Sequence, residues 1–184
     1  MTIYIRIILL SLLWICFNNR IVTAQEYITR NGTAVFTSSV PLHEFQGVSN
    51  HLTGLINFET GLVDFFLDLE TLETGNNKRD KDMRLTLDTK NFPFAEFTGN
   101  LRSTPDLEDL NNRAVTVMGT FTINGVTNQM EITGTLNRNN EKVSVQASWE
   151  INLKDFDIDP PGILFYRVDE IVKIEIEALL KPEN

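Results

Sequence analysis

Histidine and cysteine are the side chains that most often ligate metals or act as bases and nucleophiles, and this sequence holds few of them. Its 184 residues include two histidines and one cysteine. His43 and His51 are eight positions apart, near Glu44. A zinc site requires three or four ligands, and no further ligand stands at a familiar spacing. We therefore predict polar loop histidines here, without a metal site or a cofactor.

The acidic residues do not predict a catalytic pair either. The chain holds 25 of them, and most alternate with apolar residues, as Asp64 and Asp68 do along 63–70. This pattern is typical of the solvated face of a sheet, and nothing in it selects one acid and one base. The sequence also lacks a nucleophile elbow, a P-loop and a Rossmann glycine pattern. We expect no catalytic residues and no enzymatic activity.

The N-terminal residues resemble a targeting segment. Arg6 precedes an apolar run at 7–17, which is too short to span a bilayer. Val22 and Ala24 stand where signal peptidase reads small or moderate residues. We expect residues 1–24 to be a signal peptide cleaved after Ala24, and residues 25–184 to form one periplasmic or secreted domain without a stable membrane span. The alternative is an uncleaved anchor.

Composition narrows the possible partners and the source of stability. The only cysteine, Cys16, lies in the expected signal peptide, so the cleaved chain has no disulfide and depends on a hydrophobic core. The net charge is −9. An acidic domain repels phosphate backbones and anionic lipid surfaces, so we expect no nucleic-acid partner. Capture of single lipid molecules is not excluded, because it depends on a cavity and not on surface charge.

Alternation of apolar and polar residues dominates the rest of the chain and predicts strands with one buried face. Such segments are found at 34–40, 52–58, 63–70, 94–101, 115–123, 130–136, 143–153 and 172–177. Turn sequences follow at 59–61, 124–125 and 137–141, and Asn124-Gly125 is the strongest of them. Short turns favour an antiparallel meander, and one-sided burial favours its closure. The predicted fold class is an all-β antiparallel barrel of about eight strands.

Two segments interrupt this pattern, and we expect one or two short helical or irregular segments at a barrel end. The first, 74–88, carries the charged run 78–82, which is either a solvated loop or, through Arg79 and Asp80, a contact that pins the segment to the barrel rim. The second is 155–170. Its Pro160-Pro161 pair interrupts any ladder, so we expect the apolar residues near 163–168 outside the strands.

Several motifs in order resemble the YceI-like family of secreted, lipocalin-like proteins. They are 41–47 (PLHEFQG) with 52–56 (LTGLI), 74–76 (TGN) with 79–83 (RDKDM), 92–99 (FPFAEFTG), 117–127 (VMGTFTINGVT) and 155–158 (DFDI). The resemblance runs from about residue 32 to the end. One departure is Asp157, which replaces the glycine of a common Asp-Phe-Gly triplet. The resemblance implies a lipocalin-like β-barrel that holds a polyisoprenoid, a quinone or a fatty-acid derivative.

From the alternation we predict the residues that would contact such a ligand. The inward strand positions expected to line the barrel are Val63, Phe65, Leu67, Val117, Phe121, Ile132, Trp149 and Ile174. The residues expected at the rim or in a lid are Phe45, Met83, Phe92, Phe94, Phe156, Ile163, Leu164 and Phe165.

Two other functions remain open at this point. Small barrels are often filled by side chains, so the alternative is an envelope protein with a filled barrel that acts through protein contacts. A carboxylate hydrolase or isomerase is disfavoured, since the inward positions are apolar. Small inward residues, Gly99, Gly119, Gly134 and Ala147, favour a hollow barrel.

Overall fold

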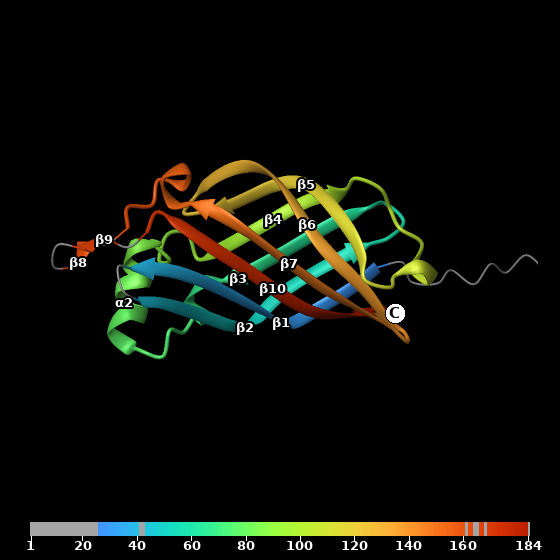
Figure 1. Ribbon diagram of the computed structural model, residues 1–184, viewed down its shortest axis with the longest axis horizontal. Helices are drawn as coiled ribbons and strands as arrows, with labels where there is room; N and C mark the ends of the chain where they lie inside the picture. Colours follow the sequence, from blue (N-terminus) through green and yellow to red (C-terminus); the bar gives the residue numbers. More distant parts are fainter. Residues whose placement is uncertain (1–25, 41–42, 161, 164–165, 168, 184) are drawn as a thin grey trace, which may run out of the picture.

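The computed structural model describes residues 26–40, 43–160, 162–163, 166–167 and 169–183. Eight antiparallel strands close into a barrel in the order β1-β10-β7-β6-β5-β4-β3-β2, as Figure 1 shows, and the predicted fold class is confirmed. The barrel strands are β1 (Glu26–Val40), β2 (His43–Asn57), β3 (Leu62–Asp68), β4 (Phe94–Leu101), β5 (Arg113–Ile123), β6 (Val126–Asn139), β7 (Lys142–Asn152) and β10 (Ile171–Pro182).

Short turns join β2 to β3, β5 to β6 and β6 to β7. Asn124 and Gly125 both have positive φ, 53° and 74°, and connect β5 to β6 as the sequence predicts. The turn after β6 is shorter than the predicted 137–141, because the ladder with β7 continues to the Asn139–Lys142 pair. Asn140, with φ of 57°, then reverses the chain.

β1 and β2 are longer than the alternation predicts. Each has 15 residues, whereas the pattern is clear only from 34 and from 52 onward. Because β2 contains both His43 and His51, the prediction of loop histidines is wrong. The β1–β2 register shifts between Thr29 and Gly32 and again between Gly32 and Ala34. A register irregularity changes which residues face inward, so the period-two pattern is lost in a segment that is nevertheless strand.

The first irregular segment contains the predicted short helix. After the 3-10 turn η1 (Leu69–Thr71), the helix α2 (Asn77–Thr86) lies at the end of the barrel where β1 ends and β2 begins (Figure 1). Asn76 caps it: its side-chain oxygen accepts hydrogen bonds from the backbone N–H groups of Lys78 and Arg79 at 3.0 and 3.1 Å.

The second irregular segment differs in part from the prediction. The 3-10 turn η3 (Leu153–Phe156) ends at Asp157, whose φ of 54° is a conformation that aspartate tolerates better than most residues. The prediction that the apolar residues near 163–168 lie outside the strands is wrong in part, because β8 (Gly162–Ile163) pairs with β9 (Tyr166–Arg167). These four residues pair only with each other and leave the barrel ladder interrupted, as the prolines imply.

The end of the barrel opposite α2 is closed by packed side chains. Tyr27 and Phe58 meet edge to face with ring centroids 5.5 Å apart. Leu110, which follows the 3-10 turn η2 (Leu107–Asp109), is 2% exposed, and Val143 and Leu180 are fully buried. The carbonyl of Leu110 accepts a hydrogen bond from the backbone N–H of Arg138 at 2.6 Å, which holds this connection against the barrel. We call this the closed end, and the end at α2 the helix end.

Candidate ligand-binding cavity

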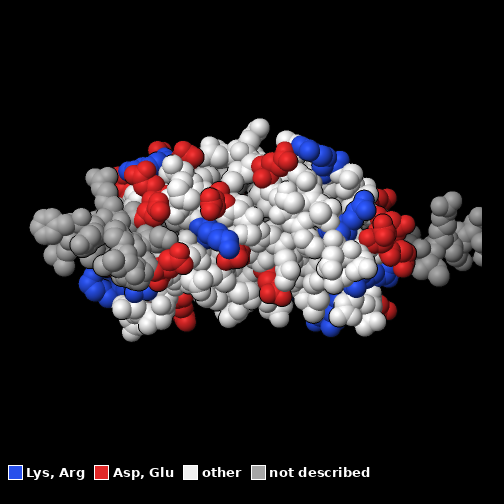
Figure 2. Space-filling view, viewed as in Figure 1, with Lys and Arg blue, Asp and Glu red and all other residues white. Residues whose placement is uncertain are grey.

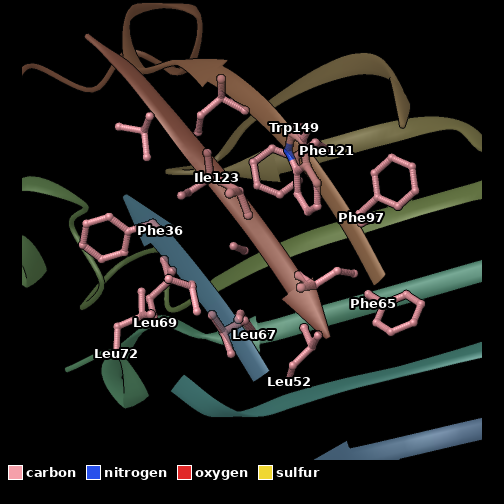
Figure 3. A pocket seen from close by; sticks show the side chains of 18 of the residues that line it. Phe36, Leu52, Phe65, Leu67, Leu69, Leu72, Phe97, Phe121, Ile123 and Trp149 are labelled. Atoms are coloured by element: carbon pink, nitrogen blue, oxygen red, sulfur yellow. The ribbon is translucent and has the colours of Figure 1, made fainter. Parts of the chain in front are cut away.

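The barrel encloses a cavity of about 850 Å³, shown in Figure 3. All eight barrel strands contribute inward-facing apolar residues to its wall, and α2 contributes residues at the helix end. The side chains that form the closed end, Tyr27, Phe58, Leu110, Val143 and Leu180, lie beyond it. The volume is within the range of cavities that bind small molecules in proteins, and apolar walls are typical of such sites.

Glycines placed opposite phenylalanines explain why the barrel stays hollow. A Cβ added to Gly47 would lie 2.0 Å from the ring of its β1 partner Phe36, and one added to Gly54 would lie 2.1 Å from the ring of its β3 partner Phe65. Each ring therefore lies over the backbone of the next strand and covers the wall instead of extending across the lumen.

Small residues widen another part of the wall. Gly134 on β6 and Ala147 on β7 are direct cross-strand partners, and both line the cavity. Since neither side chain extends far from the sheet, this pair leaves a recess between larger neighbours. The sequence prediction that these two inward positions leave volume agrees with their place on the wall.

The helix end carries the polar part of the cavity. Cap residue Asn76 and five residues of α2 contribute side chains there: Lys78, Arg79, Asp82, Met83 and Thr86. Leu87, the C-cap of α2, adds an apolar contact. Lys78 and Asp82 form an ion pair at 2.6 Å, mostly exposed to solvent. The cavity is thus apolar along its length and charged at one end.

Two contacts of the charged run fix this part of α2, one to the segment that precedes the helix and one to β2. Asp80 is 8% exposed and accepts hydrogen bonds from the Thr74 hydroxyl and the Thr74 backbone N–H at 2.5 and 2.8 Å. These bonds, the hydroxyl above all, lower the pKa of the Asp80 carboxyl despite its burial, and Arg84 and Arg79 add to the effect. The guanidinium of Arg79 lies 4.7 Å from the centroid of the Phe45 ring on β2. Of the two interpretations of the charged run, the structure favours pinning to the rim for Arg79, whereas Asp80 is bonded within the segment itself.

A comparison with models of protein families identifies the family to which this barrel belongs. The model of the YceI-like domain matches residues 26–180, which is almost the whole described barrel. The chain belongs to the YceI-like family. The resemblance seen in the sequence motifs is thereby confirmed. A search of curated protein sequences found no match.

Solved structures share the fold of this YceI-like chain at low sequence identity. A polyisoprenoid binding domain from Saccharophagus degradans, implicated in plant cell wall breakdown, is 17% identical, with a TM-score of 0.72 over 87% of this chain and 99% of that one. BcnA from Burkholderia cenocepacia is 14% identical, with a TM-score of 0.64 over 81% and 95%. The YceI protein of Campylobacter jejuni is 13% identical, with a TM-score of 0.55 over 91% and 90%.

The YceI-like barrel places all eight residues predicted to line it on the cavity wall. They are Val63, Phe65, Leu67, Val117, Phe121, Ile132, Trp149 and Ile174. Phe121 and Trp149 meet edge to face with centroids 6.2 Å apart. The alternation predicts these positions correctly because each lies on a strand with one face buried and the other exposed to solvent. Their contact with a ligand is part of the function proposed below.

The predicted rim residues are placed less uniformly. Phe45 and Met83 line the cavity at the helix end. Phe94 points outward from β4 and packs edge to face on exposed Phe66, while Phe92, 40% exposed, lies over the turn at Gly125. Phe156 is buried and packs edge-on against Phe121 without lining the cavity. Phenylalanine content alone does not say which side of a sheet a ring takes.

The remaining rim candidates, Leu164 and Phe165, lie outside the described residues, as does the side chain of Ile163. Sequence reasoning also missed other wall residues: Leu69, at the end of the alternating segment 63–70, and Leu72, which follows η1 outside any alternation. Ser38 was missed for another reason, since a serine at an inward position does not signal an apolar wall.

Two features are absent from the described residues of this YceI-like domain. Within the described ranges, no three His, Cys, Asp or Glu side chains are grouped so that they could hold a metal ion. None of the helices in those ranges is long and apolar enough to cross a membrane. Figure 2 shows acidic and basic side chains interspersed with uncharged ones over the visible outer surface.

Proposed function

We propose that this protein binds a long apolar molecule, of polyisoprenoid, quinone or fatty-acid type, inside the barrel and carries or sequesters it without altering it. The observation that carries the proposal is the cavity of about 850 Å³ with its almost wholly apolar wall. Burial of apolar surface contributes roughly 25 cal/mol per Å², so a long chain gains several kcal/mol from leaving water without any directed bond.

The two ends of the cavity orient the ligand. The closed end offers only packed apolar and aromatic side chains, whereas the helix end offers Arg79, Lys78 and Asp82. A polar head group would pay a desolvation cost among the side chains near Tyr27 and Phe58, whereas a hydrocarbon tail would not. Near α2, the head group keeps charged and polar partners. The ligand therefore enters tail first.

The family and one structural neighbour support the ligand class. The chain is a YceI-like domain over residues 26–180, and the Saccharophagus degradans neighbour is described as a polyisoprenoid binding domain. At 17% identity, the comparison with this neighbour shows a shared fold alone. The ligand of this chain is therefore inferred from its own cavity.

The proposal also includes the place where the protein acts. The apolar run at 7–17 and the site ending at Ala24 are typical of a cleaved signal peptide, and both lie outside the described residues. Removal of this segment would leave a periplasmic or secreted domain of residues 25–184, able to hold an apolar molecule in an aqueous compartment.

Catalysis finds little support in the cavity. Asp82 is the one acidic residue among the described side chains that line it, and it is paired with Lys78. A hydrolase or isomerase that uses carboxylates would need a second acid facing the lumen. The filled-barrel alternative, an envelope protein that acts by protein contact, is disfavoured by the volume of the cavity.

Native mass spectrometry tests the proposal. The full chain is expressed, purified without detergent and measured before and after organic extraction. We expect an added mass of several hundred daltons that is removed by solvent and behaves as a lipid or an isoprenoid. An unliganded mass that persists after incubation with long-chain quinones and fatty acids would contradict the proposal and favour the filled-barrel alternative.

A further inference from the structure

The strands contribute almost no polar side chains to the cavity wall. Of the described wall residues outside the helix segment 76–87, only Ser38 on β1 and Trp149 on β7 carry a polar side-chain atom. All other strand positions on the wall are aliphatic, aromatic or glycine. These two polar groups therefore stand alone in an apolar environment.

Both polar atoms lack a hydrogen-bond partner among the residues that the structure describes. The Oγ of Ser38 and the Nε1 of Trp149 are buried, and no protein group among the described residues accepts from or donates to them. Ser38 as a whole is 2% exposed. The third buried atom without a hydrogen bond, Nε of Arg84, differs, because it lies 3.3 Å from a Glu70 carboxylate oxygen. Buried hydroxyl and indole N–H groups are normally paired, so two unpaired ones beside one cavity require an explanation.

The register places the two groups in the same part of the cavity. Ser38 is level with Val172 and, one strand further, with Ile151. Trp149 is two residues before Ile151 on β7, one inward position deeper toward the closed end. Both groups thus lie in the half of the cavity nearer α2, the end proposed above for the polar part of a ligand.

We propose that the ligand carries a hydrogen-bond acceptor oxygen, such as that of a carbonyl group, which binds the indole N–H of Trp149 inside the barrel. Indole N–H donates and cannot accept, so it selects an oxygen acceptor over a hydroxyl hydrogen or a methyl group. Ser38 provides a second hydrogen-bonding position nearer α2. This inference rests on the proposed function and narrows its ligand class from any apolar chain to an amphiphile whose oxygen enters the lumen.

Neighbouring side chains cover both atoms, and the ring of Phe121 packs on Trp149. An oxygen therefore reaches Nε1 after a side-chain shift, and changes of rotamer at a binding site are common when a partner binds. The indole resonance should report this event directly.

Trp149 can be observed alone. The chain has two tryptophans, so a full-length variant with Trp14→Phe leaves one indole N–H in the ¹H–¹⁵N spectrum. The probes are geranylgeranylacetone, a polyisoprenoid ketone, and a polyisoprenoid hydrocarbon of the same chain length. We expect the ketone to move the indole proton downfield and the hydrocarbon to leave it near its unliganded position.

Affinities for the same two probes give the second readout. A single hydrogen bond to a donor that is otherwise unpaired should make the ketone bind about tenfold more tightly than the hydrocarbon. Trp149→Phe should remove this preference while hydrocarbon binding changes by about threefold or less, and Ser38→Ala should reduce the preference less. Phe65→Leu is the matched control, because it alters the wall without removing a polar atom and should weaken both probes alike.

The outcomes separate this inference from the proposed function. Equal affinity of the wild-type protein for both probes, or a ketone preference that survives Trp149→Phe, would overturn the acceptor assignment and leave an apolar-chain carrier standing. Failure of both probes to bind would contradict the proposed function itself. A downfield indole shift with the ketone alone, lost preference in Trp149→Phe and unchanged preference in Phe65→Leu would establish the assignment.

Discussion

The closed end and the helix end are built from the same barrel strands but are sealed by different physical means. At the closed end, Leu180 and Val143 are fully buried and Tyr27 packs edge to face on Phe58. At the helix end, a ten-residue helix is held by the hydrogen bonds of Asp80 and the contact of Arg79 with Phe45. Dense apolar packing makes the first end rigid, and a few polar contacts leave the second one easier to open.

This difference divides the molecule into a part that maintains the fold and a part that handles the ligand. Substitutions at the closed end should act on the free energy of unfolding, while substitutions at the helix end should act on the rate at which a ligand leaves. Variants at the two ends of the barrel can break or confirm this division.

Leu180→Ala should destabilise the protein most. The side chain is fully buried at the closed end, so its truncation leaves a cavity and costs about 2–5 kcal/mol of unfolding free energy. Urea denaturation measures this loss. A cost below about 1 kcal/mol would show that the closed end is not densely packed.

Ile174→Ala, on the same strand, should cost less than Leu180→Ala, about 1–2 kcal/mol. Ile174 is half-buried and lines the cavity, so part of its side chain has no packing partner to lose. The same denaturation experiment compares the two variants on β10. Equal costs would imply that Ile174 packs in a filled core, contrary to the cavity.

Asp80→Asn should weaken the attachment of α2 by about 1 kcal/mol, because the hydrogen bonds from Thr74 lose their charged acceptor. Hydrogen exchange of the α2 amides should accelerate, and so should ligand release. Asp82→Asn is the matched control on the same helix, since the exposed pair with Lys78 contributes little. Equal acceleration in both variants would argue against Asp80 as the anchor.

Asp80 also predicts a pH dependence. Its pKa is lower in the folded protein than the ordinary value of 3.8, so its charged form favours folding. This contribution is fully present above pH 3.8 and is lost as the pH falls through the lower folded pKa. Stability measured against pH should show this loss in the wild type and lack it in Asp80→Asn; identical profiles would contradict the assignment.

Arg79→Gln should have the smallest effect, about 0.5–1 kcal/mol, because it removes one partly exposed cation–π contact with Phe45. Ligand release should accelerate slightly with little change in the melting temperature. Phe45→Leu should reproduce the change, and the double variant should add little to either single one, which a double-mutant cycle measures. Full additivity would show that the two side chains do not interact.

The strands were predictable where one face is buried along their whole length. From 63 to 68 and from 143 to 152, inward and outward residues alternate without interruption, so the sequence alone predicts both the strand and its buried face. The predicted ends at 70 and 153 run one or two residues into the 3-10 turns η1 and η3. Residues 26–33 form strand as well, but the register shifts near Gly32 remove the alternation. The local pattern therefore predicts that a barrel forms, but it does not predict the full length of each strand.

The cavity itself was not predictable from alternation. Its open lumen depends on pairs distant in sequence, such as Phe36 with Gly47 and Phe65 with Gly54, whose register only the folded sheet defines. Likewise, the apolar ring of Phe94 lies outside the barrel because it is one position out of phase with Ala95 and Phe97. Whether a side chain points inward follows from its odd or even position along the strand. How much space remains inside the barrel follows from which residues the strand register places opposite each other.

Two neighbouring residues on β7 can show whether a ligand binds inside the barrel. Ala147 lines the cavity, and the adjacent Ser148 is exposed on the outer face. Each is replaced by tryptophan, and the fraction of protein carrying an extractable ligand is measured by native mass spectrometry. A carrier should lose most of its bound ligand in Ala147→Trp, since the indole fills the lumen, and keep it in Ser148→Trp. Equal occupancy in two folded variants would contradict a ligand site inside the barrel.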